Sequence, residues 1–348
     1  ALCEKSCVLN LSCGEPTTNR EDECAIAERA FIESYIHISD PKRNGHQVAV
    51  IGSGPAGLAT ANRLNKMGYL VTVFEQEELP GGLLRYGIPN FKLNKAIIDR
   101  RLNIMKKEGV IFCCNQQVDI QHLPSGFDAY VIATGTPVAR DLDIPGRDLN
   151  GIYLALDLLS QQNKVLAGHS FSEDQRISGK NKRVLVIGGG DTGSDCIGTV
   201  RRQGCLDVTQ IEIMPKPPVG NNPQTPWPQW PVVLKTTSSH EEGCNRRWLL
   251  NTNRFIGKDG CVTGAEVEEI SWTEPKDGER PTMIRSGKTE IIPCDMVLLA
   301  MGFIRPQHPQ LPEGVFVAGD AASGASLVVK AMANAHQVAK KVDEYLSR

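Results

Sequence analysis

The stretch Val48-Ala-Val-Ile-Gly52-Ser-Gly54-Pro-Ala-Gly57 decides the fold class of this chain. Its apolar residues predict a buried strand, and the spacing then predicts a helix over 57–67 that ends at Gly68. A second strand is predicted over 70–74, which completes a strand–helix–strand unit. In such a unit Gly52 permits a tight turn, Gly54 lets a pyrophosphate approach the backbone, and Gly57 permits close packing of helix on strand.

The first unit carries an acidic residue, Glu75, at the end of its second strand. A carboxylate at this place accepts hydrogen bonds from an adenosine ribose and repels a 2′-phosphate. The N-terminus of the helix faces the phosphates of the dinucleotide. We therefore predict a dinucleotide site without a 2′-phosphate, formed by Gly52, Gly54, Pro55, Ala56, Gly57 and Glu75.

The same pattern returns at Val184-Leu-Val-Ile-Gly188-Gly-Gly190-Asp-Thr-Gly193. A helix is predicted over 192–203 and a strand over 208–214, so the chain contains two strand–helix–strand units and two parallel-sheet domains. The cofactor contacts expected in this second unit are Gly188, Gly189, Gly190, Asp191, Thr192 and Gly193.

The end of the second strand differs between the two units. Alignment at the glycines that end the helices places Ile211 opposite Glu75, and a longer turn places Met214 there. Glu212 has the sequence distance of an NAD-type acid, but isoleucines flank it, so we expect it inside the strand and not at its end. A missing acid with bases nearby is what a 2′-phosphate requires. The sequence therefore favours NADPH over NADH, with contacts from Arg202 and Lys216.

Two further strand ends point to a flavin. Val131-Ile-Ala-Thr134-Gly135 is an apolar strand that ends in a small-residue turn, and Gly314-Val-Phe-Val-Ala-Gly319-Asp320 precedes a helix predicted over 326–345. Asp320 can hold a ribityl hydroxyl. The helix N-terminus, at Ser326, Leu327 and Val328, can stabilise negative charge on a reduced flavin. We therefore expect FAD in the first unit and NADPH in the second.

Together and in this order, these segments resemble the flavoprotein disulfide-reductase superfamily, in which the NADPH domain is inserted in the FAD domain. The resemblance sharpens at Leu79-Pro-Gly-Gly-Leu-Leu-Arg-Tyr-Gly-Ile-Pro-Asn-Phe-Lys-Leu93, which is similar to the small (β) subunit of glutamate synthase and its relatives. These relatives include the half of dihydropyrimidine dehydrogenase at which electrons enter. Further matches are 188–196, 213–218, 226–231, 239–243 and 299–303.

The resemblance implies further site residues and a domain plan. It adds Gly82, Leu83 and Lys92 to the FAD site, and Ala300, Met301 and Gly302 to the nicotinamide side. The expected fold is α/β, with two Rossmann-like three-layer domains. Residues 46–145 and 303–348 would form the FAD domain, residues 146–302 the inserted NADPH domain, and residues 1–45 a linker with a remnant of a helical iron–sulfur domain.

The family's N-terminal domain binds two [4Fe–4S] clusters through several short groups of cysteines. Cys3 and Cys7 resemble only the last of these groups, and the earlier groups would precede Ala1. A cubane cluster needs four thiolates, so Cys3 and Cys7 are expected as ligands only where the preceding segment is present. Cys13 and Cys24 are interpreted as ordinary cysteines. Relatives also carry a longer segment between residues 303 and 314.

These inferences predict an enzyme that oxidises NADPH through FAD and passes electrons toward iron–sulfur clusters and a partner. The partner would be the large subunit of glutamate synthase or another electron-accepting subunit. Hydride transfer to flavin needs no side-chain acid or base, so no catalytic residue is assigned. A net charge of −2 over 348 residues argues against nucleic-acid and membrane partners. No export signal is recognised, so a cytoplasmic location is expected.

Other functions remain open at this stage. A related electron-bifurcating or ferredoxin-linked NADPH oxidoreductase would share both nucleotide sites. A disulfide reductase needs a Cys-x-x-Cys motif near the flavin, and the adjacent pair Cys113-Cys114 has the wrong spacing. Two complete nucleotide sites argue against a non-catalytic scaffold subunit, and NADPH oxidation with an artificial acceptor would separate the two.

Overall fold

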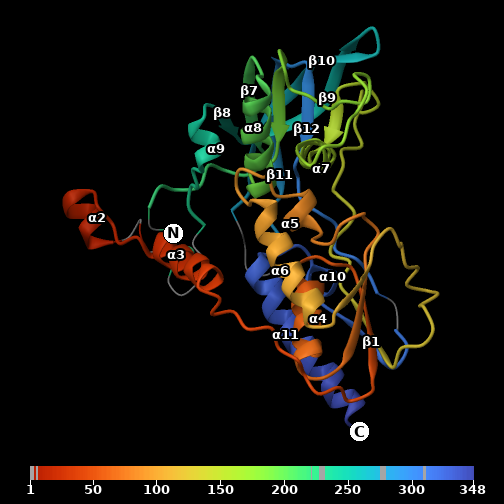
Figure 1. Ribbon diagram of the computed structural model, residues 1–348. Coiled ribbons are helices and arrows are strands. Elements are labelled where there is room, and N and C mark those ends of the chain that lie inside the picture. The colour runs from red at the N-terminus through yellow and green to blue at the C-terminus, as the bar shows by residue number, and fades with distance from the viewer. Residues whose placement is uncertain (1–3, 5–6, 221, 227–231, 275–279, 309–310) are drawn as a thin grey trace.

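The computed structural model describes residues 4, 7–220, 222–226, 232–274, 280–308 and 311–348. This part of the chain forms two five-stranded parallel sheets and one three-stranded antiparallel sheet (Figure 1). Each parallel sheet holds one of the two glycine-rich units, with helices packed on it. The predicted α/β class with two Rossmann-like units is therefore confirmed.

The first sheet has the strand order β13-β4-β1-β2-β3. Helices α4 (Pro55–Lys66) and α11 (Val328–Leu346) pack on one face, where alternate strand residues such as Val48 and Val50 meet helical Leu64 and Ala335. The strands are β1 (Gln47–Ile51), β2 (Leu70–Phe74), β3 (Ile111–Cys113), β4 (Ala129–Ile132) and β13 (Val315–Val317). The remaining helices of this domain are α5 (Leu83–Tyr86), α6 (Lys95–Lys107) and α10 (Asp320–Ser323).

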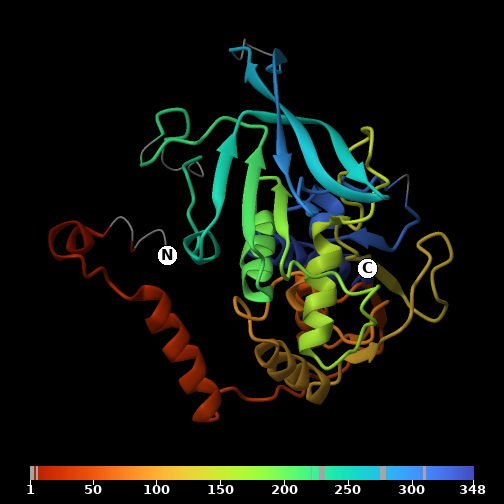
Figure 2. The same ribbon diagram turned by 90° about the horizontal axis from the view of Figure 1, so that it is seen from above.

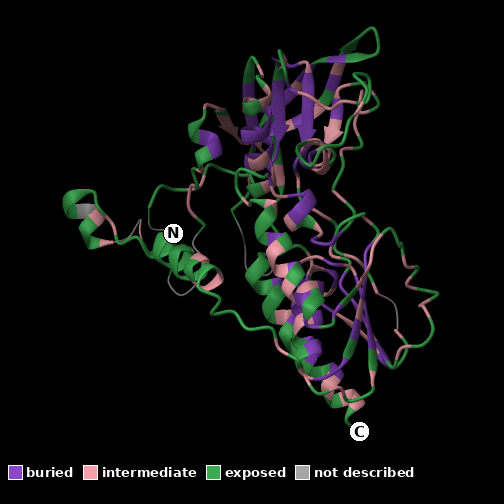
Figure 3. Ribbon diagram, in the orientation of Figure 1, coloured by how far each residue is buried: buried purple, intermediate pink, exposed green. Residues whose placement is uncertain are grey.

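The other face of this sheet is covered by the irregular connection 114–128. Ala49, Ile51 and Phe74 form its buried core, and Phe127 packs edge-on against Phe74 at a centroid distance of 5.8 Å. The third layer of the first domain is therefore an irregular connection. The inner strands β1, β2 and β4 are largely buried, whereas the edge strands β3 and β13 are partly exposed (Figure 3).

The second sheet has the order β5-β12-β6-β7-β8, in which β12-β6-β7-β8 correspond to β4-β1-β2-β3 of the first sheet, while the edge strand β5 comes before the others in the chain and β13 comes after them. Helices α7 (Ala155–Leu166) and α8 (Asp191–Gln203) cover one face, and the antiparallel sheet packs against the other through a core that includes Leu185, Ile211 and Val267. The parallel strands are β5 (Ile152–Leu154), β6 (Arg183–Ile187), β7 (Asp207–Glu212), β8 (Asn245–Trp248) and β12 (Met296–Leu299). The antiparallel strands are β9 (Leu250–Lys258), β10 (Cys261–Trp272) and β11 (Met283–Pro293), and the short helix α9 (Ser238–Glu241) precedes β8.

Two chain segments connect the domains and run side by side. Ala139 and Phe303 form an antiparallel bridge, and the N–H of Arg140 donates to the carbonyl of Gly302 at 2.9 Å. The strands of the first sheet come from both ends of the chain, and those of the second come from the middle. The exact boundaries at 145/146 and 302/303 stay a prediction.

The N-terminal region forms an arm that stands away from both sheets (Figures 1 and 2). It contains α2 (Val8–Cys13) and α3 (Asn19–Ile32), and α3 buries none of its residues. Arg100 of α6 holds α3 through two 2.7 Å hydrogen bonds to Glu28 and lies 3.6 Å above the Phe31 ring. Within the described residues, no helix has the length and apolar character needed to cross a membrane.

Candidate functional site

The first glycine loop lies where three other segments of the chain converge. A Cβ on Gly52 would stand 2.6 Å from the carbonyl oxygen of Ala133 and 3.1 Å from the nitrogen of Thr134. A Cβ on Gly82 would stand 2.8 Å from the Cα of Gly54. The backbones therefore approach so closely that only glycine fits, and the predicted segments around Thr134–Gly135 and Gly82–Leu83 do border the loop.

The end of β13 completes this convergence. A Cβ on Gly319 would stand 2.4 Å from the Cβ of Ala56, in the first turn of α4. The next residue, Asp320, accepts a 2.7 Å hydrogen bond from the hydroxyl of Ser326. Helix α11 begins two residues later at Val328, with Leu327 as its N-cap. The predicted group of Asp320 and 326–328 is thus assembled beside the first glycine loop.

Gly54 differs from its neighbours because it has free space around its Cα hydrogens. Its φ of −66° suits any residue, and a Cβ there would meet no protein atom within 4 Å. It is the N-cap of α4, whose first position is Pro55. The first N–H groups of a helix attract anions, so this cradle fits the pyrophosphate of a dinucleotide.

Glu75 fixes the shape of the same loop. It follows β2 directly and is 5% exposed. One carboxylate oxygen accepts from the backbone N–H of Ser53 at 3.1 Å, and the other accepts from the N–H of Glu77 at 2.9 Å. The Ser53 hydroxyl also donates to this carboxylate. Glu75 thus lies against the loop from the position at which an adenosine ribose is expected.

The second glycine loop repeats the first in detail. The N–H of Gly188 donates to Ile211 at 2.9 Å, as the N–H of Gly52 donates to Phe74 at 2.8 Å. A Cβ on Gly188 would stand 2.2 Å from the carbonyl oxygen of Ala300, so the predicted nicotinamide-side segment 300–302 borders this loop. A hollow here is lined by Ala139, Ala155, Leu156, Thr192, Leu299, Ala300, Met301, Gly302 and Phe303.

Gly190 is the counterpart of Gly54. Its φ is −80°, and a Cβ there would meet no protein atom within 4 Å. It is the N-cap of α8, and Asp191 and Thr192 form the first turn of that helix. The second loop therefore offers the same phosphate cradle as the first.

The expectation that Glu212 lies inside its strand is wrong. Strand β7 ends at Glu212, because Ile213 leaves the ladder and gives its carbonyl to the Trp272 indole at 3.0 Å. One Glu212 carboxylate oxygen accepts from the N–H of Gly189 at 2.5 Å and the other from Met214 at 3.1 Å. These are the bonds that Glu75 makes in the first unit, so Glu212 is its structural equivalent.

The turn before the second strand is one residue longer in the second unit than in the first. Strand β2 begins at Leu70, two residues after Gly68, whereas β7 begins at Asp207, three residues after Gly204. The register pairs Ile187 with Ile211 as it pairs Ile51 with Phe74. Alignment at the glycines is therefore one residue out, and the argument for NADPH from a missing acid loses its basis.

The two predicted bases lie in different places. Arg202 is in the last turn of α8, which is about 16 Å from the glycine loop at 1.5 Å per residue. It pairs with Glu242 at 2.7 Å and lies 3.6 Å above the Phe91 ring, so the structure does not bring it to the loop. The Lys216 ammonium lies 5.1 Å from the ring of Trp248, the neighbour of Glu212 across the sheet. Lys216 thus lies near Glu212, at the end of the second site where the adenosine ribose is expected.

Lys92 is predicted to bind FAD, but its side chain makes polar contacts with the second domain. Its ammonium pairs with Asp195 of α8 and lies 3.4 Å from the hydroxyl of Ser194. Leu83, the first residue of α5, is 44% exposed beside the first loop. The contact of Lys92 with FAD stays a prediction.

The cysteines fall into separate regions. Cys3 lies outside the described residues. Cys7 is the half-buried N-cap of α2, where a hydrogen bond from the backbone of Thr17 is the main cause that lowers the pKa of its thiol. Cys113 ends β3 and gives its carbonyl to the N–H of Glu75, and burial raises the pKa of Cys114. A reactive redox thiol needs a lowered pKa, so the raised pKa of Cys114 is unfavourable for disulfide-reductase chemistry at this position.

Comparison with known proteins identifies the family. The family described as pyridine nucleotide-disulphide oxidoreductase matches residues 46–310. The small chain of NADPH glutamate synthase from Mycobacterium tuberculosis is 41% identical over 377 aligned residues, which cover 99% of this chain and 76% of the relative. The chain belongs to the glutamate synthase small-chain family. The alignment is longer than the 348 residues of this chain, so at least 29 residues of that relative have no counterpart.

Other members of the family differ in the coenzyme they are named for. The NADPH glutamate synthase small chain of Bacillus subtilis is 35% identical over 99% of this chain and 77% of its own length. The NADH glutamate synthase of Schizosaccharomyces pombe is 36% identical over 99% of this chain, which covers 18% of that longer protein. Family membership alone therefore does not choose between the two coenzymes.

Solved structures agree on the fold. FprA of Mycobacterium tuberculosis in complex with NADPH aligns with a TM-score of 0.68 at 18% identity, over 87% of this chain and 84% of that one. The thioredoxin reductase of T. acidophilum aligns with a TM-score of 0.58 at 16% identity, over 86% of this chain and 97% of that one. The small-chain family is thus one of oxidoreductases with the FAD- and NAD(P)-binding fold, and FAD and NADPH are the predicted cofactors of this class.

Glu212 should control the choice of coenzyme. Glu212→Gln removes a negative charge from the ribose end, so it should raise the ratio of kcat/KM for NADPH to that for NADH about 10- to 100-fold, the equivalent of one charge-assisted hydrogen bond. Steady-state oxidation of both coenzymes with a dye acceptor measures this ratio. Glu75→Gln, the matched change in the first unit, should leave the ratio unchanged in protein that retains FAD. An unchanged ratio in Glu212→Gln would show that this carboxylate does not face the ribose.

Proposed function

We propose that this protein takes a hydride from a reduced nicotinamide dinucleotide at the second loop and delivers the electrons through FAD at the first. The observation that carries the proposal is the presence of two equivalent phosphate cradles, at Gly54 and Gly190, in one chain. Each is the N-cap of a helix, and each has a carboxylate, Glu75 or Glu212, bonded to its loop. Two such sites suit a transfer between two dinucleotides.

The residues of this chain bind and orient the reactants and need not exchange protons. FAD, when bound, would accept the hydride and release electrons one at a time. Gly54 and Gly190 would admit the pyrophosphates, and Glu75 and Glu212 would accept hydrogen bonds from ribose hydroxyls. Segment 300–302 would border the nicotinamide, because Ala300 already lies against the second loop. Alignment of the two rings is then the main catalytic contribution of the protein.

We further propose that the physiological acceptor is a partner subunit with iron–sulfur clusters, with glutamate synthesis as the final reaction. The names of relatives at 35–41% identity support this choice. The position of the cysteine pair 113–114 beside Glu75, with a raised pKa at Cys114, disfavours disulfide reduction. NADPH is the coenzyme named for most of these relatives, and the acid Glu212 makes NADH a serious competitor.

Dye reduction tests the proposed activity. The FAD-loaded protein should oxidise NADPH or NADH with ferricyanide or a quinone as acceptor, at turnover numbers in the ordinary enzyme range of about 1–10³ per second. It should form glutamate from glutamine and 2-oxoglutarate only after addition of a glutamate synthase large subunit. Failure to reduce any dye with either coenzyme, in protein shown to contain FAD, would refute the proposal.

A further inference from the structure

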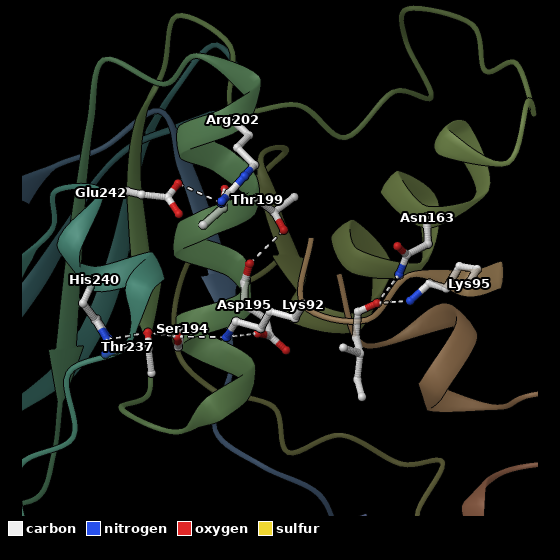
Figure 4. Close-up of polar contacts among 12 residues, drawn as sticks. Lys92, Lys95, Asn163, Ser194, Asp195, Thr199, Arg202, Thr237, His240 and Glu242 are labelled. Atoms are coloured by element: carbon white, nitrogen blue, oxygen red, sulfur yellow. Dashed lines mark hydrogen bonds and ion pairs between the residues drawn. The ribbon is translucent and has the colours of Figure 1, made fainter. Parts of the chain in front are cut away.

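The segment 77–95, which includes the family motif, lies between the two domains. On one side it meets helix α7, where Lys164 pairs with Glu77 at 2.9 Å. The neighbouring Asn163 amide donates to the carbonyl of Ile88 at 3.0 Å (Figure 4). Lys95 donates to the same carbonyl at 2.5 Å, and burial lowers the pKa of Lys95 to about 8. The segment is therefore attached to the second domain by ordered polar contacts.

On its other side the segment meets helix α8. Lys92 forms an ion pair with Asp195, whose side chain is only 13% exposed. Phe91 lies beneath the guanidinium of Arg202, 3.6 Å from the ring centroid. A buried ion pair is geometrically demanding, because removal of one partner leaves the other charge unpaired. Lys92 thus joins the first domain to the first half of α8. This helix begins at the second glycine loop, residues 188–190, which is called the coenzyme loop below.

From this pair a chain of hydrogen bonds continues through the second domain (Figure 4). The hydroxyls of Ser194 and Thr237 are 2.6 Å apart, and the Thr237 hydroxyl lies 3.0 Å from Nδ1 of His240. The backbone N–H of Thr237 donates to the same nitrogen at 3.1 Å. Nε2 of His240 lies 3.2 Å from Oε1 of Gln210, and the Gln210 amide donates to the carbonyl of Gly188 at 2.9 Å. The chain ends at the first glycine of the coenzyme loop.

The donors in this chain can all point the same way. Nδ1 of His240 accepts a backbone N–H, so the ring proton is on Nε2 and donates to Gln210. Burial, followed by the charges of Arg246 and Lys92, lowers the pKa of His240 to about 4, and the ring is neutral at neutral pH. Lys92 can donate to Ser194, which leaves the Ser194 hydroxyl free to donate to Thr237. Each link therefore orients the next.

The first unit has no such chain at the equivalent position. Register pairs Gln210 with Val186, as it pairs Val73 with Val50. Strand β7 thus holds an amide where β2 holds an apolar residue, although Gln210 is only 2% exposed. A buried amide in a parallel strand is unfavourable unless it is hydrogen-bonded, so Gln210 has a specific use in the second unit.

We propose that Lys92 is an interdomain positioning residue, which acts through Asp195, Ser194, Thr237, His240 and Gln210 to set the coenzyme loop at Gly188 relative to the flavin domain. The inference rests on the proposed hydride transfer. Lys92 would not touch the reacting atoms; it would align the loop that holds the coenzyme. A displacement of about 1 Å between reacting groups can slow a reaction about 100-fold, so the effect belongs in the transfer step.

Anaerobic stopped-flow reduction of the FAD-loaded protein tests this role. The double variant Lys92→Met/Asp195→Asn removes the interdomain pair without leaving a buried charge, and Gln210→Val places the residue of the first unit at the far end of the chain. Each should lower the limiting rate of flavin reduction about 10- to 100-fold and change the dissociation constant of the coenzyme less. The single variant Lys92→Arg, which keeps the positive charge, should retain much of the unmodified protein's rate of flavin reduction. Lys288→Met, which removes an exposed pair with Glu269, is the matched control and should be normal.

The combination of all three changes discriminates a relay from separate structural effects. If one chain carries the effect, the combined variant should be no slower than the slower parent, because the second break adds nothing. The proposal would be overturned if the rate losses of the two parent variants multiplied in the combined variant. It would also be overturned if the parent variants reduced their flavin within about twofold of the rate of the unmodified protein. If one of these variants does not fold, Thr237→Val can replace it. This change removes the hydroxyl that contacts Ser194 and should lower the rate of flavin reduction in the same way. An unmodified protein that fails to reduce its flavin would instead refute the proposed function.

Discussion

Gly54→Val should give a folded protein that contains no FAD. The backbone at Gly54 has φ −66° and ψ −175°, which valine adopts readily, and a Cβ there meets no protein atom within 4 Å. The fold should therefore tolerate the change. The added side chain would project from the N-cap of α4 into the path of a pyrophosphate, and the close approach of phosphate to backbone would be lost.

Absorption spectra and a thermal unfolding curve measure the two parts of this expectation. The variant should be colourless after reconstitution with excess FAD, and its apoprotein should unfold near the temperature of the unmodified apoprotein. Gly57→Val is the contrasting change, because its Cβ would stand 1.9 Å from the carbonyl oxygen of Gly52 and should disrupt the fold itself. Stoichiometric FAD in Gly54→Val would show that the first loop is misassigned.

Gly190→Val should have the opposite effect: the protein should keep FAD and lose the oxidation of the nicotinamide coenzyme. Gly190 has φ −80° and ψ −176°, and a Cβ there is equally free of protein contacts. The variant should be yellow with one FAD per chain, because the first loop is unchanged. It should oxidise neither NADPH nor NADH at a measurable rate, since the new side chain would occupy the phosphate cradle at the N-terminus of α8.

Chemical reduction provides the control for this second variant. Dithionite should reduce the flavin of Gly190→Val as fully as that of the unmodified protein, because this reductant needs no dinucleotide site. A variant that retains coenzyme oxidation would assign the second loop another ligand. Loss of FAD from both glycine variants would mean that the two domains fold together and that the sites cannot be tested separately.

The two glycine loops and their strands are predictable because their signals are local. A Cβ on Gly52 or Gly188 would stand less than 3 Å from a neighbouring carbonyl oxygen, so these turns require glycine. Strands β1 and β6, which precede the turns, are apolar runs, as is usual for buried parallel strands. These signals occupy about ten neighbouring residues each. Helix boundaries were also close: α8 begins at Asp191 and α11 at Val328, within two residues of the predicted starts.

The partners of charged side chains were not predictable in the same way. Lys92 entered the FAD site by resemblance, and its ion pair with Asp195 exists only because two domains meet there. Arg202 was placed near a 2′-phosphate from its position in the sequence, but the length of α8 carries it to the far end of the domain. Gln210 carried a usable signal, since an amide interrupts a strand whose equivalent in the first unit is apolar.

Local sequence signals were enough to predict two strand–helix–strand units with phosphate-binding turns, and longer motifs pointed to the correct family. Local backbone geometry imposes those residues directly. The folded chain was needed to see that Glu212 ends its strand and accepts a hydrogen bond from the second loop, as Glu75 does from the first. Strand ends depend on register with neighbouring strands, and one additional residue after Gly204 shifted that register. The predicted choice of coenzyme and the proposed coupling of the two domains therefore rest on contacts between residues far apart in the chain.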